Sequence, residues 1–166
     1  MSERTPGSGV FKTVPLYEDK PINEDGPQWN VYRLSLSKMK QLRSRLTHWR
    51  VTCSFQLDGL VYRDFVRAKI IDFDPLTLKG ASICKRVEYI NVRGHSCSEC
   101  DVAWWQDDVM LHHDSSKSAV CEFVSSSGAV QSEDNFGYYD VANPNFRCTE
   151  SGRESTTNYW FGSYLE

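Results

Sequence analysis

The sequence predicts an α+β fold, in which a mainly antiparallel sheet carries one prominent amphipathic basic helix packed on it. Apolar residues recur at helical spacing in one window and alternate with polar residues in several others, and turn dipeptides separate the alternating windows. The chain has 166 residues, of which 40% are hydrophobic and 13% aromatic. This is enough for one hydrophobic core and excludes a chain that is disordered throughout.

The first 28 residues predict a flexible N-terminal arm, and residues 29–166 predict a single core domain. The arm is rich in Gly, Pro, Ser and charged residues and shows neither helical nor strand periodicity. It contains one short apolar cluster: Val10, Phe11, Val14, Leu16 and Tyr17. We expect this cluster to dock on a neighbouring subunit and so to mediate self-association.

The helix is predicted after a first strand at residues 29–34. Ser35 and Ser37 are candidate N-caps, and apolar residues then follow at helical spacing. These residues are Leu36, Met39, Leu42, Leu46 and Trp49. The basic residues between them fall on the other sides, which makes the helix amphipathic.

Strands are predicted after the helix. Apolar and polar residues alternate over 51–57, and Asp58-Gly59 favours the tight turn of a hairpin whose return strand is 60–62. Residues 66–73, 83–92 and 119–124 predict further strands, whereas 93–118 is polar apart from Trp104-Trp105. The aromatic groups at 138–139 and 159–161 fit either a base-stacking platform, or the core or a subunit contact.

A run of positive charge predicts a surface that binds polyanions. Residues 31–57 contain six Lys and Arg and no Asp or Glu, so no acidic residue within this window neutralises them. We expect contacts to phosphates of RNA or of anionic lipids from Lys38, Lys40, Arg43, Arg45 and Arg50. The alternative is a solvated helix face with no partner.

Charge is also divided along the whole chain. Residues 1–98 carry sixteen Lys and Arg against ten Asp and Glu, and residues 99–166 carry three against twelve. A folded protein with one basic and one acidic side can lie against a polyanion or associate head to tail with copies of itself.

The six cysteines raise the question of a metal site. The first residues lack the apolar core of a secretory signal, so we expect the cysteines to be reduced rather than paired in disulfides. Four residues are spaced along the chain in a way that is compatible with a tetrahedral zinc site: Cys97, Cys100, His112 and Cys121. The alternative is that the strand cysteines are small core residues and that the protein holds no cofactor.

Catalytic motifs are missing from the sequence. It contains no nucleophile elbow, phosphate loop or paired-carboxylate signature. We therefore expect a protein that is not an enzyme and has no small-molecule substrate.

The order of features over residues 39–80 resembles the core of rhabdovirus matrix proteins, in particular those of the plant-infecting cytorhabdoviruses. The resemblance lies in a helix ending in Thr47-His48-Trp49, an alternating strand, a basic strand with an aromatic residue, and the segment Lys69-Ile70-Ile71-Asp72-Phe73. It implies a virion structural protein that self-associates and bridges the viral nucleocapsid and the anionic inner face of the envelope. Such a protein is found in the virion and in the host cytoplasm, peripheral at membranes.

A second function remains open beside this one. A zinc-containing regulator that binds nucleic acid, such as a viral suppressor of RNA silencing, would use Cys97 and Cys100 as metal ligands.

Overall fold

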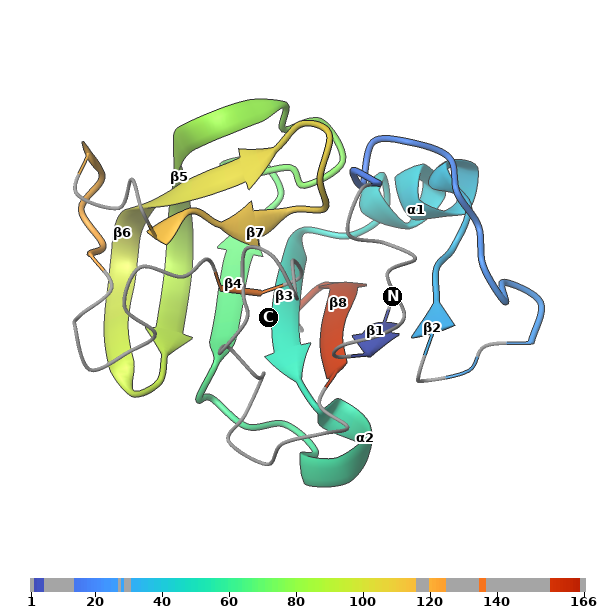
Figure 1. Cartoon of the computed structure of the whole chain (residues 1–166), viewed down its shortest axis with the longest axis horizontal. Coiled ribbons are helices and arrows are strands. Elements are labelled where there is room, and N and C mark those ends of the chain that lie inside the picture. Colours follow the sequence, from blue (N-terminus) through green and yellow to red (C-terminus); the bar gives the residue numbers. More distant parts are fainter. Residues whose placement is uncertain are drawn as a thin grey trace.

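One antiparallel sheet makes up most of the structure, a computed structural model that describes residues 2–4, 14–26, 28, 31–115, 120–124, 135–136 and 156–164. Its strand order is β2-β1-β8-β3-β4-β5-β6-β7, and the sheet curls into a half-barrel (Figure 1). The strands are β1 (Ser2–Arg4), β2 (Val31–Tyr32), β3 (His48–Cys53), β4 (Phe65–Lys69), β5 (Gly80–Val92), β6 (His95–Gln106), β7 (His112–His113) and β8 (Thr156–Gly162). The helices are α1 (Leu36–Arg43) and α2 (Phe55–Asp58).

The predicted α+β class is wrong, because the helix is too short to cover the sheet. Helix α1 has eight residues and ends at Arg43, and in Figure 1 it lies at the edge of the molecule rather than across the strands. Met39 is buried, whereas Leu42 is 40% exposed. Trp49, which the periodicity placed on the helix, lies in β3 instead. A single buried position leaves α1 little apolar surface to pack on a sheet.

The core explains why β3 replaces the end of the helix. Trp49, Val51 and Cys53 alternate along β3 and are buried. The ring of Trp49 packs edge-on against Phe73 and Trp104, with ring centroids 4.8 and 5.9 Å apart, and its Nε1 donates to the carbonyl oxygen of Phe73 at 2.6 Å. These long-range contacts bury a large aromatic surface, which the local helical pattern cannot offer.

The hairpin predicted around Asp58-Gly59 is also wrong. Residues 55–58 form α2, and β3 pairs with β4 on one side and with β8 on the other. The predicted strand at 119–124 is wrong as well, since residues 120–124 have no strand structure. The long strand β6 lies instead in the polar region 93–118, where it pairs with β5.

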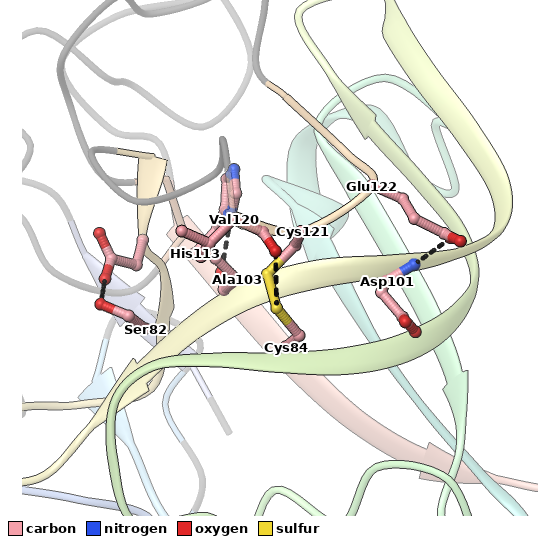
Figure 2. The surroundings of a disulfide bond; sticks show 9 residues. Ser82, Cys84, Asp101, Ala103, His113, Val120, Cys121 and Glu122 are labelled. Carbon is pink, nitrogen blue, oxygen red and sulfur yellow. Dashed lines mark hydrogen bonds between the residues drawn. A yellow bond between two sulfur atoms is a disulfide. The ribbon is translucent and has the colours of Figure 1, made fainter.

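Two disulfides overturn the expectation of reduced cysteines. Cys84 on β5 is bonded to Cys121, and Cys97 is bonded to Cys100 within β6 (Figure 2 shows the first pair). All the cysteines in the described part of the chain are in disulfides. The sequence could not show this, because Cys84 and Cys121 are 37 residues apart and meet only when segment 120–124 lies against the β5–β6 hairpin.

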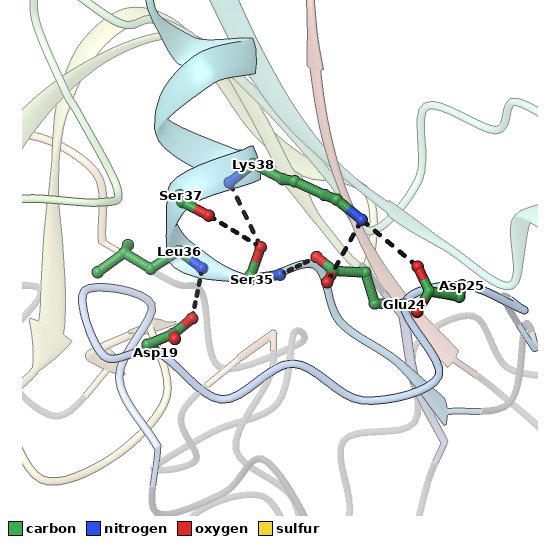
Figure 3. A network of polar contacts seen from close by, with 7 residues as sticks. All are labelled: Asp19, Glu24, Asp25, Ser35, Leu36, Ser37 and Lys38. Carbon is green, nitrogen blue, oxygen red and sulfur yellow. Dashed lines mark hydrogen bonds and ion pairs between the residues drawn. The ribbon is translucent and has the colours of Figure 1, made fainter.

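Carboxylates from the N-terminal segment cap the first turn of α1 (Figure 3). The backbone N–H of Ser35 donates to Glu24 at 2.6 Å, and that of Leu36 donates to Asp19 at 2.8 Å. Lys38 pairs with Glu24 at 3.3 Å and with Asp25 at 3.7 Å. Helix α1 has no acidic residue in its own first turn. The preceding segment therefore supplies the negative charge that a helix N-terminus favours.

This cap predicts a loss of stability in acid. The backbone N–H of Ser35, then its side chain and Lys38, hold the pKa of Glu24 below its ordinary value. A carboxylate whose pKa is lower in the folded state stabilises the protein above the unfolded pKa, and this contribution disappears as the pH falls through the folded pKa. We expect Glu24→Gln to lower the melting temperature at pH 7 but much less below about pH 4. Thermal melts of this variant at both pH values test this. The control is Glu18→Gln, which removes a nearby carboxylate that does not cap the helix.

Candidate polyanion-binding face

A row of rings and cations crosses four strands on the face of the sheet opposite the core. The strand register places Trp160 opposite Arg50, Arg50 opposite Arg67, and Arg67 opposite Tyr89. Directly opposite residues of antiparallel strands lie on the same face, with their Cβ atoms about 5 Å apart. The row from β8 to β5 is therefore ring, cation, cation, ring.

A second row lies beside the first. Here Gly162 is opposite His48, and His48 is opposite Lys69. We call the four basic residues of the two rows, His48, Arg50, Arg67 and Lys69, together with the rings of Trp160 and Tyr164, the basic face. Like charges directly opposite each other destabilise a sheet, so this arrangement costs stability.

One carboxylate compensates part of this charge. Glu88 contacts Arg67 Nε at 2.9 Å, His48 Nε2 at 3.4 Å and Lys69 Nζ at 3.9 Å. Within the described ranges, no other carboxylate is within ion-pair distance of the four basic residues. Arg50, Arg67 and Lys69 alone carry three positive charges against this single negative one, so the basic face retains a positive potential.

Aromatic rings hold the guanidinium groups in place. Arg50 Cζ lies 5.6 Å from the ring centroid of Trp160, and Arg67 Cζ lies 5.0 Å from that of Tyr164. The ring of His48 meets that of Tyr164 edge-on at 4.7 Å. Burial lowers the pKa of Arg67, but the hydrogen bonds and charges of Tyr164 and Glu88 raise it by more. The net shift of the pKa is therefore upward, and the guanidinium stays charged. Such stacking fixes the direction of the donors without neutralising them.

Two depressions adjoin the basic face. A hollow of about 200 Å³ is lined by Gly162, His48, Arg50, Trp160 and Tyr164, together with Trp49, Phe161 and Ser163. An open groove of about 820 Å³ shares His48 with it. Further basic residues along this groove are Arg43, Lys69 and Lys85. Asp72 and Asp74 also line the groove, whereas no carboxylate of the described residues lines the hollow, so the hollow is the more positive of the two depressions.

The structure divides the basic residues predicted from the sequence. Arg50 lies in the row, and Arg43 lines the groove while pairing with Asp74 at 2.7 Å. Lys38 is engaged by Glu24 and Asp25 at the far end of α1. Lys40 and Arg45 are exposed and line neither depression. The helix is therefore not the centre of the positive surface.

The sequence did not point to His48, Arg67, Lys69, Lys85 or the ring of Tyr164 as site residues, and it offered the aromatic group at 159–161, which contains Trp160, only as one of two interpretations. One signal was present: in HWRVTC of β3 and FVRAK of β4, basic residues alternate with buried ones. This alternation predicts cations on one face of each strand. It does not reveal that the two strands are neighbours.

The apolar cluster of the arm docks on its own chain where it is described. Leu16 is 1% exposed and belongs to the core, and its backbone N–H donates to Gln106 Oε1 at 2.8 Å. Val14 and Tyr17 are half-buried, and the Tyr17 hydroxyl donates to the carbonyl oxygen of Asp107. Val10 and Phe11 lie outside the described residues. Leu16 is thus not available to anchor a neighbouring subunit.

The predicted zinc ligands are not brought together. Cys97 and Cys100 are bonded to each other and Cys121 to Cys84, so three of the four ligands are not thiolates. His112 is buried, with its Nδ1 2.7 Å from the carbonyl oxygen of Met110. Among the residues that the structure describes, no cluster of His, Cys, Asp and Glu could hold a metal.

No family model matches the chain, and no curated protein or solved structure matches it either. In the described part of the chain, neither helix has the length and apolar character needed to cross a membrane.

Proposed function

We propose that this protein is a non-enzymatic structural protein that binds phosphate groups of a polyanion on its basic face and associates with copies of itself. The observation that carries the proposal is the register that sets Arg50 opposite Arg67 and His48 opposite Lys69. In the matrix-like form of this function, the polyanion is the viral nucleocapsid or an anionic membrane.

The energetics of the face support a bound anion. Arg50 and Arg67 lie opposite each other and repel one another, and Glu88 offsets only part of the positive charge. A phosphate between Arg50 and Arg67 would accept hydrogen bonds from both guanidinium groups and relieve their repulsion. Violations of a local rule of this kind are typical of functional sites.

The basic face would recognise the negative charge of phosphate groups rather than a nucleotide sequence. Cations on neighbouring strands meet phosphate oxygens of any nucleic acid or lipid headgroup, and each bound phosphate releases counterions. Binding should therefore weaken steeply with salt.

Self-association has support in the charge distribution. Asp107 and Asp108 are exposed directly after β6, and Glu99 is exposed within it. These carboxylates are opposite in charge to the basic face, so a contact between two copies can pair them with its cations. A polyanion would compete for the same cations.

Neutralising the basic face tests the proposal. We expect Arg50→Gln combined with Lys69→Gln to weaken binding to RNA by about 10-fold at low salt and to reduce the slope of log K against log salt by about one to two units. Sedimentation with RNA, with anionic vesicles and with neither measures binding to both polyanions and self-association in one series.

The matched control is Lys20→Gln combined with Lys40→Gln, which removes the same charge from exposed positions outside the basic face. If both double variants lose affinity equally, net charge rather than the face governs binding, and the proposal is wrong. Unchanged binding in the first variant has the same consequence.

A further inference from the structure

One of the residues that line the hollow in the basic face is a glycine, Gly162. Its partner across the sheet is His48, and a Cβ placed on Gly162 would meet no atom within 4 Å. Its backbone conformation lies outside the left-handed region, so a larger residue would be tolerated there. The glycine is therefore needed neither for the turn of the chain nor for close packing.

Two aromatic residues border the space that the glycine leaves. Trp160 precedes Gly162 by two residues and Tyr164 follows it by two, and both line the hollow. Tyr164 is 49% exposed, which leaves much of its side chain accessible to a ligand. Rings placed in this way stack on a flat ligand, and the volume of about 200 Å³ suits a single ring system rather than a large molecule.

Basic side chains adjoin the same space. His48 and Arg50 line the hollow, and Arg67 and Lys69 lie opposite Arg50 and His48 on the next strand. A flat group seated beside Gly162 would thus carry any attached phosphate toward these cations. We propose that the hollow holds one unpaired base of a single-stranded nucleic acid whose backbone phosphates lie on the basic face.

This inference rests on the proposed function and narrows it to one class of polyanion. A duplex keeps its bases stacked and paired, so it would have to unpair to use the hollow. A phospholipid headgroup offers a phosphate but no planar ring to stack on the two aromatic side chains. Single-stranded nucleic acid offers both an unpaired base that can stack on the rings and phosphates that can bind the cations.

The test compares three labelled probes by fluorescence anisotropy on the full chain: a short oligouridylate, an abasic oligonucleotide of the same length, and a duplex. We expect the oligouridylate to bind about 10-fold more tightly than the abasic probe, because stacking of a base adds to the phosphate contacts. Gly162→Leu should fill the hollow and bring the two affinities together. Binding of the abasic probe should remain.

Gly26→Leu is the matched control, since a Cβ at this glycine also meets no atom and the residue lies outside the basic face. It should leave the preference for the oligouridylate unchanged. Circular dichroism checks the fold of each variant, and Tyr164→Ala removes one ring of the hollow without adding volume should Gly162→Leu fail to fold.

Four outcomes would overturn the inference. Equal affinity of the wild-type protein for oligouridylate and abasic probe means that no base is held, although salt-dependent binding of both would still support the proposed function. A preference that persists in both folded variants places the base elsewhere. Binding of anionic vesicles with no binding of any oligonucleotide makes a membrane the partner; no binding of any polyanion rejects the proposed function as well.

Discussion

Replacing Cys84 or Cys121 by serine should lower the free energy of unfolding by about 4 kcal/mol. A disulfide restricts the unfolded chain, and this effect grows with the number of residues in the loop that it closes, here 37. The bond also holds segment 120–124 on the β5–β6 hairpin, where Asp101 N–H donates to Glu122 at 2.9 Å (Figure 2). In the same segment, Phe123 N–H donates to Asp101 O at 2.9 Å. Guanidinium denaturation under oxidising conditions measures the loss.

Cys97→Ser provides the comparison within the same protein. Its disulfide joins residues only three apart, so the same loop argument gives a loss of about 1–2 kcal/mol. Equal losses in the two variants, or a wild-type protein whose stability does not change on reduction, would show that the 37-residue loop does not contribute as described.

The failure of the predicted hairpin shows how long-range pairing overrides a strong local signal. Asp58-Gly59 is a favoured hairpin turn, yet β3 pairs with β4 and β8 and buries Val51 and Val66 between them. The burial gained across the sheet exceeds what a two-stranded hairpin could offer. The chain therefore reverses through α2 and a longer loop.

The β5–β6 hairpin was missed for the opposite reason, because its local signal is weak. Its turn is Arg93-Gly94, with positive φ at both residues, as a tight hairpin turn requires, but arginine rarely marks such a turn. Four of the first five residues of β6 are polar and exposed, so this part of the strand shows little alternation of apolar and polar residues. The first half of β6 forms a strand because it pairs with β5.

The candidate site could be predicted in part. The excess of positive charge near Arg50 was visible in the sequence, and Arg50 lies in the row. Its partners Arg67 and Lys69 come from another strand, and their position opposite Arg50 and His48 follows from register, which one sequence does not specify. The window 31–57 does not show that Lys38 and Arg43 form ion pairs, because their partners Glu24 and Asp74 lie outside it.

Arg33 should be among the residues most important for stability. It is fully buried, and its guanidinium donates to the carbonyl oxygens of Val14, Pro15 and Glu18 at 3.0, 2.7 and 2.6 Å. Arg33→Met should cost about 3–5 kcal/mol, because it leaves buried carbonyl groups without a charged donor. The free energy of unfolding in urea measures this cost.

The same substitution tests whether Arg33 holds residues 14–18 of the N-terminal segment on the core. If the carbonyls of residues 14–18 are held by Arg33, their release should make the Tyr17–Glu18 bond accessible to chymotrypsin and withdraw Leu16 from the core. Arg33→Lys keeps the charge but not the planar fork, so we expect an intermediate loss of stability and partial protection from chymotrypsin. Chymotrypsin cleavage after Tyr17 that is equally slow in the wild type and in Arg33→Met would show that other contacts hold the segment. The hydrogen bonds of Arg33 to these carbonyl oxygens would then be unnecessary for holding Leu16 in the core of its own chain.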